Sequence, residues 1–224
     1  MYQGKHMNTE IYQTIRDRII HLDYTPGQIL KEQILAKEFG VSRTPLRTVL
    51  FRLEWEHLIK ILPRTGILVM ELELNTITNV FQARLELEAV IGSMAAERFT
   101  QDHIQRLKQL STACNSLLDH KDPKALGALD MKIKDLFNQA AGNPFLIEMS
   151  ERLYSLTFRL WYFNMLKMEN IAWNQEVLAV KKDLEELINL LKSGTPELAG
   201  KARKAQLINH LKRIRSKFLG LSDL

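Results

Sequence analysis

The sequence predicts a mainly α-helical protein in which an N-terminal winged helix-turn-helix precedes a C-terminal all-α antiparallel bundle. A short apolar helix over 32–39 ends at Gly40, and a second helix with a basic edge begins at Ser42. A hairpin pattern follows that helix, and from Thr76 onward the apolar residues recur at helical spacing only. The expected domains are a flexible lead over 1–8, a winged helix-turn-helix over 9–73 and an all-α domain over 74–224.

The N-terminal domain is predicted to begin with an amphipathic helix that ends near Asp23. Its apolar residues are spaced three or four apart: Ile11, Ile15, Ile19 and Leu22. A turn is expected at Tyr24-Thr25-Pro26-Gly27, because proline fixes φ and glycine relaxes it. Ile29-Leu30-Lys31 then leads into the helix over 32–39.

The helix that begins at Ser42 is predicted to have one buried face and one basic face. The buried face consists of Leu46, Val49, Leu50 and Leu53. Ser42 or Thr44 can cap the helix by accepting a bond from a backbone N–H, and Pro45 is tolerated in the first turn. Arg43 and Arg47 lie four residues apart on another face. Two interpretations of this pair are open: an edge that reads DNA, or a solvated arginine pair on a surface helix.

Two short apolar runs, 58–62 and 67–70, flank the tight turn Pro63-Arg64-Thr65-Gly66. A hairpin directly after a helix-turn-helix is typical of a wing, whose tip commonly contacts the phosphate backbone or the minor groove. We therefore expect Arg64, at the tip, to make such a contact.

About six helices are expected in the second domain. They are predicted over 80–94, 104–117, 125–140, 145–167, 174–192 and 196–219. Gly142-Asn143-Pro144 separates two of them, because the glycine ends one helix and the proline cannot continue it.

Composition excludes several classes of protein. No apolar run approaches the roughly 18–20 residues needed to span a bilayer, and the N-terminus lacks the apolar region of a signal peptide. The single cysteine, Cys114, indicates a reducing, cytoplasmic location. The net charge is +5, but residues 1–73 carry ten Lys/Arg against nine Asp/Glu, so charge gives little support for DNA binding. Much of the basic excess lies over 201–217, which we interpret as a solvated helix face.

Residues 35–47, followed by 64–69, closely resemble the winged helix of GntR-family bacterial transcription regulators. Residues 84–88, 140–144 and 209–211 resemble the all-helical effector domain of the FadR-like (FCD) branch of that family. The resemblance covers nearly the whole chain. It implies a homodimer that binds a short DNA palindrome, and that releases or tightens on it when a small metabolite enters the helical domain.

The resemblance also implies which residues contact double-stranded DNA. The matching positions are Ser42, Arg43, Thr44 and Arg47 in the helix, Arg64, Thr65 and Gly66 in the wing, and Gln33. Arginine reads guanine O6 and N7 through paired donors, so we expect Arg43 or Arg47 to read a base. The family often has an arginine where Gln33 stands and a glycine where His57 stands. The change to glutamine at position 33 is expected to alter the operator sequence that the protein binds, and not the fold.

Many family members hold a divalent metal with an aspartate, a histidine four residues later and two further histidines. Here Asp130 and His210 keep the first and last positions, whereas Lys134 and Leu184 stand at the other two. Two ligands are too few for a closed metal site, so we predict a metal-free or weakly metal-binding pocket. An Asp130–Lys134 pair in the pocket would replace the charge of the metal; the alternative is that the two residues form a surface salt bridge. For His210, the alternative to a role in the pocket is an exposed or hydrogen-bonded helix histidine. Arg84 matches a family arginine that suits a carboxylate or phosphate effector.

The predicted function is therefore a sequence-specific DNA-binding repressor controlled by a small, carboxylate-bearing metabolite. The expected effector-binding residues are Arg84, Asp130, Lys134 and His210. One alternative is a constitutive DNA-binding dimer whose effector pocket has lost its function. Another is a hydrolase that uses Asp130 and His210, but the chain lacks a glycine-rich phosphate loop, a nucleophile elbow and an HExxH motif, so no enzyme is predicted.

Overall fold

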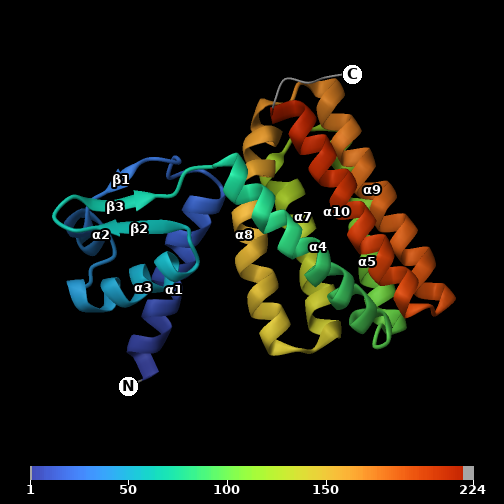
Figure 1. Cartoon of the computed structure of the whole chain (residues 1–224), viewed down its shortest axis with the longest axis horizontal. Coiled ribbons are helices and arrows are strands. Elements are labelled where there is room, and N and C mark those ends of the chain that lie inside the picture. Colours follow the sequence, from blue (N-terminus) through green and yellow to red (C-terminus); the bar gives the residue numbers. More distant parts are fainter. Residues whose placement is uncertain (1, 219–224) are drawn as a thin grey trace. The chain divides into compact units, whose positions relative to one another are not determined.

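The computed structural model describes residues 2–218, which form helices and one small sheet (Figure 1). It confirms the predicted fold class, a winged helix-turn-helix followed by an all-α domain. The chain passes from a first compact unit to a second between Ile77 and Thr78.

The first unit is built from three helices and three strands. They are α1 (Tyr2–Ile20), β1 (Ile29–Leu30), α2 (Glu32–Glu38), α3 (Arg43–Trp55), β2 (Ile59–Leu62) and β3 (Gly66–Val69). The predicted buried face of α3 is confirmed, and it packs on apolar residues of α1 such as Ile15 and Ile19. The flexible lead predicted over 1–8 is wrong for 2–8, which continue α1. Extending an existing helix is much easier than nucleating one, and no proline interrupts this segment.

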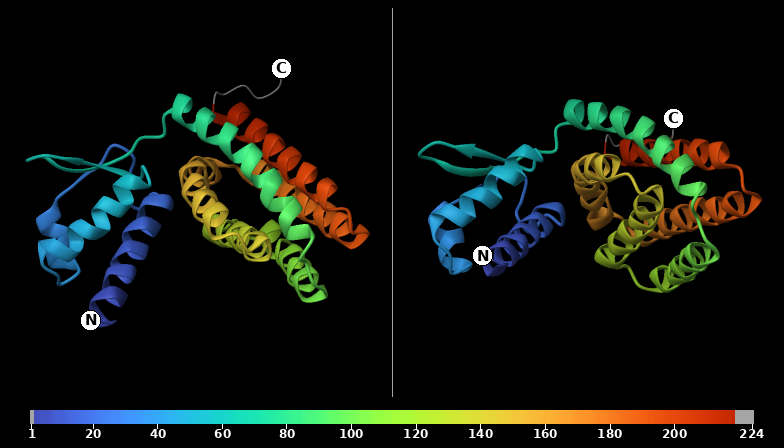
Figure 2. Two further views of the ribbon diagram at one scale, coloured as in Figure 1. Left: turned by 60° about the horizontal axis from the view of Figure 1, so that its bottom comes forward. Right: turned by 90° about the horizontal axis from the view of Figure 1, so that it is seen from below.

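The sheet has the order β1-β3-β2, with both pairs antiparallel. The β2–β3 hairpin confirms the predicted wing, and Figure 2 shows it projecting from the helices of this unit. Strand β1 was not predicted: Ile29 and Leu30 pair with Leu68 and Ile67 in addition to leading into α2. Gly66 has a φ of 144°, and a Cβ there would lie 2.6 Å from the carbonyl oxygen of Leu30. Only glycine therefore permits β1 to pair at this point.

Helices α2 and α3 end in the same kind of turn. Gly40 follows α2 with a φ of 64°, and His57 follows α3 with a φ of 60°. In each case the N–H of this residue and the N–H of the residue after it donate to carbonyls of the last helical turn, which is the Schellman arrangement. The left-handed conformation suits glycine and strains other residues by roughly 1 kcal/mol, so His57 is strained where Gly40 is not.

The second unit is entirely helical in the part that the structure describes. Its helices are α4 (Leu74–Ala96), α5 (Gln101–Ala113), α6 (Ser116–Asp119), α7 (Pro123–Ala141), α8 (Pro144–Lys167), α9 (Asn170–Ser193) and α10 (Pro196–Phe218). The helix predicted over 104–117 is interrupted at Cys114 and Asn115, which separate α5 from the single turn α6. The other predicted helices are confirmed, with ends that differ by up to six residues from the prediction. Over residues 2–218, none of the helices combines the length and apolar character that crossing a bilayer requires.

Helices α4 and α10 cross in close contact, as Figure 2 also shows. A Cβ on Gly200 would lie 2.1 Å from Ser93 Oγ and 2.5 Å from the carbonyl oxygen of Ala89. A Cβ on Gly92 would lie 3.1 Å from the Cα of Gly200. The two glycines therefore let the backbones approach, and they fix the level at which Arg203 of α10 faces α4.

Candidate nucleic-acid interface and effector site

A groove of about 680 Å³ lies between α2, α3 and the β2–β3 hairpin of the first unit. Six of the eight residues predicted to contact DNA line it: Gln33, Arg43, Arg47, Arg64, Thr65 and Gly66. The other two, Ser42 and Thr44, lie at the start of α3. The fold thus brings side chains from the two helices and the wing to one surface.

Glu32 orients Arg47 in this groove. Arg47 donates from Nε to Glu32 Oε1 at 2.9 Å and from Nη2 to Oε2 at 3.3 Å. The Arg47 side chain is nevertheless 57% exposed. A guanidinium has five N–H donors in a rigid fork, so the Nη1 donors remain to contact a base.

The N-terminus of α3 is suited to an anion. Ser42 is its N-cap residue, but the Ser42 hydroxyl makes no capping hydrogen bond. The prediction that a Ser42 or Thr44 side chain caps the helix is therefore wrong. Ser42 occupies the extended cap conformation, but its hydroxyl does not accept from the first backbone N–H groups of α3. Unpaired N–H groups and the helix dipole favour a phosphate at such a position.

The wing turn presents Arg64 in a strained conformation. The N–H of Thr65 donates to the carbonyl of Leu62 at 3.1 Å, which closes the turn, and Arg64 has a φ of 63°. Lys31 Nζ donates to the carbonyl of Thr65 at 2.8 Å and so ties the turn to the start of α2. An arginine at a position that favours glycine is a local departure from the most stable sequence, as is common at functional positions.

We expect Arg64→Gly to raise the free energy of unfolding by about 1 kcal/mol, because glycine relieves the left-handed conformation. The same variant is expected to weaken DNA binding and to reduce the salt dependence of binding by about one phosphate contact. His57→Gly is the matched control, since His57 has a similar φ but does not line the groove. Urea unfolding and DNA titration at several salt concentrations measure both effects. Equal DNA affinity for the two variants would contradict the role of Arg64.

A polar cluster fixes α3 against α1. The hydroxyl of Tyr12 donates to Glu56 at 2.7 Å, and Arg52 donates to the same carboxylate at 3.2 Å. The guanidinium carbon of Arg52 also lies 3.6 Å from the centre of the Tyr12 ring. Burial and the neighbouring Glu56 carboxylate raise the pKa of Tyr12 well above its usual value. Tyr12 therefore stays a hydrogen-bond donor, and the orientation of α3 is fixed at its C-terminal end.

In the second unit, the predicted effector residue Arg84 is part of a buried ion triad. Arg84 Nη2 lies 3.0 Å from Glu88 Oε1, and Arg203 Nη2 lies 2.6 Å from Glu88 Oε2. Glu88 is only 2% exposed. Burial acts to raise its pKa, but the two arginines outweigh burial and hold that pKa at about 2. The triad carries a net positive charge, and Arg203, which supplies one of its two positive charges, could not be identified from the sequence pattern.

Asp130 and Lys134 do not pair with each other as predicted. Tyr154 donates its hydroxyl to Asp130 Oδ2 at 2.7 Å, while Lys134 Nζ lies 3.5 Å from Asp135. Lys134 also lies 5.1 Å from the centre of the Tyr154 ring, and Arg84 lies 5.2 Å from it. The Tyr154 hydroxyl thus occupies the position at Asp130 that was predicted for Lys134, and the Lys134 ammonium lies near the Tyr154 ring instead.

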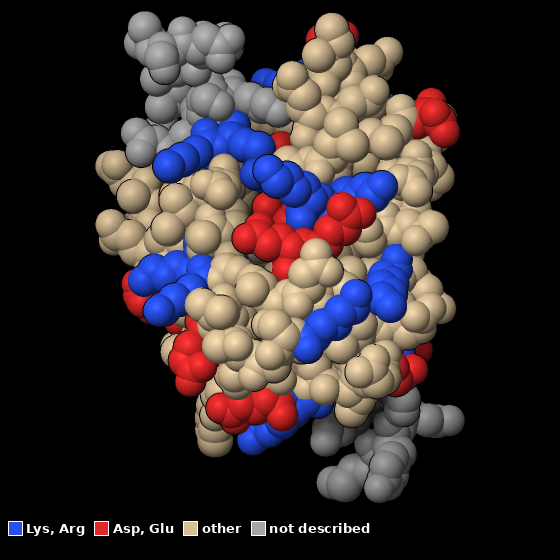
Figure 3. Space-filling view, turned by 90° about the vertical axis from the view of Figure 1, so that its right-hand side faces the viewer, with Lys and Arg blue, Asp and Glu red and all other residues tan. Residues whose placement is uncertain are grey.

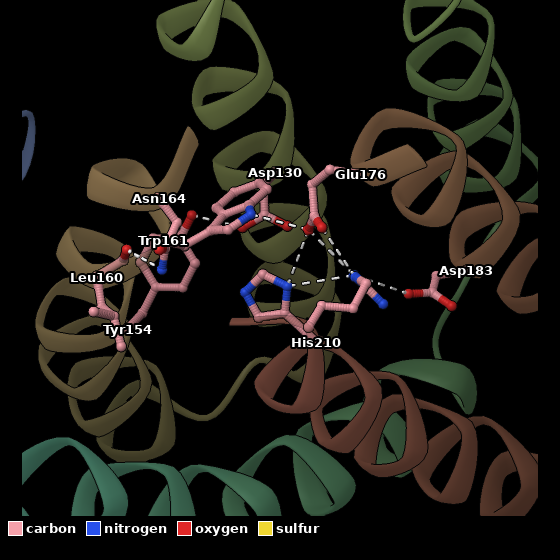
Figure 4. A network of polar contacts seen from close by, with 9 residues as sticks. Asp130, Tyr154, Leu160, Trp161, Asn164, Glu176, Asp183 and His210 are labelled. Atoms are coloured by element: carbon pink, nitrogen blue, oxygen red, sulfur yellow. Dashed lines mark hydrogen bonds and ion pairs between the residues drawn. The ribbon is translucent and has the colours of Figure 1, made fainter. Parts of the chain in front are cut away.

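His210 belongs to a second buried network (Figure 4). Its Nδ1 lies 3.6 Å from Glu176 Oε1, which also accepts from Trp161 Nε1 at 3.0 Å. Arg213 donates to the other oxygen of Glu176 at 3.1 Å. Burial acts to raise the pKa of Glu176, but His210 and Arg213 outweigh it and hold that pKa at about 2. Glu176 could not be identified from the sequence, because the family's ligand position on this helix was assigned to Leu184, which is a buried core residue.

These residues do not fit a divalent metal. The described residues include no group of three or more His, Cys, Asp or Glu side chains placed to hold one. Asp130 already accepts from Tyr154, and the carboxylate beside His210 is paired with Arg213. Lys134 adds a cation where the family has a ligand. The protein's own cations therefore neutralise the carboxylates that a metal would need.

We expect acid to destabilise the second unit through Glu88 and Glu176. Their pKa values of about 2 lie below the ordinary value of 4.5, so their stabilisation is complete above pH 4.5 and is lost as the pH falls toward 2. Thermal unfolding at pH 7, 4.5 and 3, followed by fluorescence of the buried Trp161 and Trp173, measures this loss. Glu176→Gln is expected to flatten the pH dependence; an unchanged dependence would contradict the assignment.

Acidic and basic side chains are intermixed on the face of the second unit in Figure 3, without a continuous basic surface. The prediction of a solvated basic face over 201–217 is wrong for Arg203 and Arg213. Their side chains are 16% and 24% exposed and pair with Glu88 and Glu176. The side chains of Arg215 and Lys217 lie outside the described residues.

Two known protein families match successive parts of the chain. The family described as "Bacterial regulatory proteins, gntR family" matches residues 7–69, and the family described as "FCD domain" matches residues 79–212. The chain belongs to the GntR family. Its FCD domain places it in the branch that the sequence motifs predicted.

Relatives of this GntR-family protein are transcription regulators. It is 26% identical to the HTH-type transcriptional repressor RspR of Escherichia coli over 70% of this chain and 69% of the relative. It is 25% identical to the Uxu operon regulator of Haemophilus influenzae over 98% of this chain and 90% of the relative. The solved structure of E. coli McbR/YncC has the same fold, with a TM-score of 0.82, 17% identity and coverage of 95% and 98% of the two chains. The family and these names are those of regulators and not of enzymes.

Proposed function

We propose that this GntR-family protein is a homodimeric transcriptional repressor whose operator binding is modulated by a small carboxylate in the FCD domain. The observation that supports it most strongly is the groove, which gathers Gln33, Arg43, Arg47 and Arg64 on one surface of the first unit. A recognition helix places its N-terminal residues against base edges, and α3 has both arginines there.

The groove supports a division of roles among its residues. Arg47, oriented by Glu32, is suited to guanine, and Gln33 beside it is suited to adenine through its amide. Ser42 and the first N–H groups of α3 are suited to a phosphate, and Arg64 to a phosphate or the minor groove. Two such DNA-binding surfaces, related by dimer symmetry, match a palindromic operator.

Effector control is supported by the buried positive charge of the FCD domain. Arg84 and Lys134 approach the Tyr154 ring from α4 and α7, and both are mostly buried. A carboxylate is the natural partner of such cations. It changes operator affinity only if it binds the DNA-competent and DNA-incompetent dimers with different affinity.

A gel-shift titration with the DNA upstream of the protein's own gene tests this function. We expect a salt-sensitive, palindrome-selective complex whose affinity changes when a small carboxylate raises the melting temperature of the protein. A reporter under the same promoter is expected to be more active when the gene is deleted. Carboxylates that leave both stability and DNA affinity unchanged would favour the constitutive DNA-binding dimer, and absence of palindrome selectivity would contradict the proposal.

A further inference from the structure

Two buried polar side chains of the FCD domain have no hydrogen-bond partner among the described residues. Both amide atoms of Asn138 are in this state, and so is the hydroxyl of Ser150. Asn138 is 3% exposed and Ser150 is 1% exposed. A buried polar group without a partner is costly, and its presence in a native fold indicates a water, an ion or a ligand that completes it.

The register of α7 against α8 places these two groups beside the predicted effector residues. Lys134 of α7 lies over the ring of Tyr154 of α8. Asn138 is one turn beyond Lys134 and Ser150 is one turn before Tyr154, so both lie toward the short connection between the two helices. Lys134, Asn138, Ser150 and Tyr154 are all buried on these two helices, and we call them the α7–α8 polar cluster.

The charges near this cluster favour an anion. Arg84, Arg203 and Lys134 bring three positive charges to this part of the domain, where Glu88 pairs with the two arginines and Asp130 accepts from Tyr154. Lys134 also has Asp135 at 3.5 Å, but the Asp135 side chain is 53% exposed, so solvent screens that pair. An acceptor oxygen placed by Lys134 would gain a buried cation as its partner.

We propose that the α7–α8 polar cluster is a binding subsite for a small hydroxycarboxylate. The carboxylate would accept from Lys134 Nζ and Asn138 Nδ2, and the hydroxyl would donate to Asn138 Oδ1, with Ser150 able to donate or accept. A simple carboxylate leaves Asn138 Oδ1 without a donor, and a neutral diol leaves Lys134 without an anion. This subsite rests on the proposed effector function and specifies its ligand class.

The first test needs no ligand. We expect Asn138→Leu to raise the melting temperature of the free protein by about 2–4 °C, because it removes an unpartnered amide at nearly constant volume. Gln139→Leu, at the exposed neighbouring position, is the matched control and is expected to leave it unchanged. A lower melting temperature for Asn138→Leu would show that the amide is a structural group and would overturn the subsite.

The second test uses 2-hydroxybutyrate, butyrate and 1,2-butanediol at millimolar concentration. Only 2-hydroxybutyrate is expected to raise the melting temperature of the wild type, and the shift is expected to disappear in Asn138→Leu and to shrink in Ser150→Ala. Equal shifts in wild type and Asn138→Leu, or no shift in the wild type, would overturn the subsite. Operator binding by the wild type without ligand is measured separately by gel shift, and its absence would count against the proposed function alone.

Discussion

Glu88→Gln is expected to lower the free energy of unfolding of the FCD domain by about 3–5 kcal/mol, as is typical when one partner of a buried ion pair is removed. Glu88 lies between Arg84 and Arg203 and is almost fully buried. The amide keeps the shape of the side chain but removes the negative charge that pairs with both guanidinium groups. Urea unfolding of the full chain, followed by fluorescence of Trp161 and Trp173, measures the change.

Glu86→Gln is the matched control for this variant. Glu86 is on the same helix and pairs with Lys204, but its side chain is 73% exposed. Exposed pairs contribute little, so the control is expected to change stability by less than about 1 kcal/mol. Equal effects of the two substitutions would mean that the triad does not stabilise the α4–α10 contact as its geometry indicates.

Arg47→Ala is expected to weaken operator binding by about 10- to 100-fold and to relax selectivity at one base position of each half-site. Arg47 is held by Glu32 in a groove that also contains Arg43 and Arg64. Its exposed guanidinium contributes little to stability, so folding should be preserved. Fluorescence anisotropy with the palindrome and with single-base variants measures both effects.

Arg106→Ala is the matched control for charge. Arg106 is 56% exposed and pairs with Asp102, much as Arg47 is 57% exposed and pairs with Glu32, but it lies on α5 of the FCD domain. We expect it to bind the operator as the wild type does. If both variants lost the same affinity, the loss would come from net charge and not from a base contact.

Local patterns predicted most of the fold, and the exceptions have physical causes. The recognition helix could be predicted because Leu46, Val49, Leu50 and Leu53 repeat at helical spacing. Strand β1 could not, because two residues show no periodicity and become a strand only through pairing with β3. The N-terminal extension of α1 was missed because helix propagation depends on what is already folded beside it.

The groove residues could be predicted from a contiguous motif, whereas the buried networks could not. Arg84 and Glu88 are spaced four apart in the sequence, but Arg203 meets them only because Gly92 and Gly200 let two helices approach. Likewise, Tyr154 intervenes between Asp130 and Lys134 through tertiary packing alone. Residues that are far apart in the sequence and meet only in the folded protein have no characteristic spacing, so a single sequence does not reveal that they are partners.

The central claim is that α3 and the wing read a palindromic operator as a symmetric pair. Hydroxyl-radical footprinting of the wild type on the DNA upstream of its own gene tests it most directly. We expect two protected half-sites with centres about one helical turn apart or a multiple of it, both weakened together by Arg47→Ala. A single protected site, a sequence-independent footprint, or protection unchanged by Arg47→Ala would contradict it.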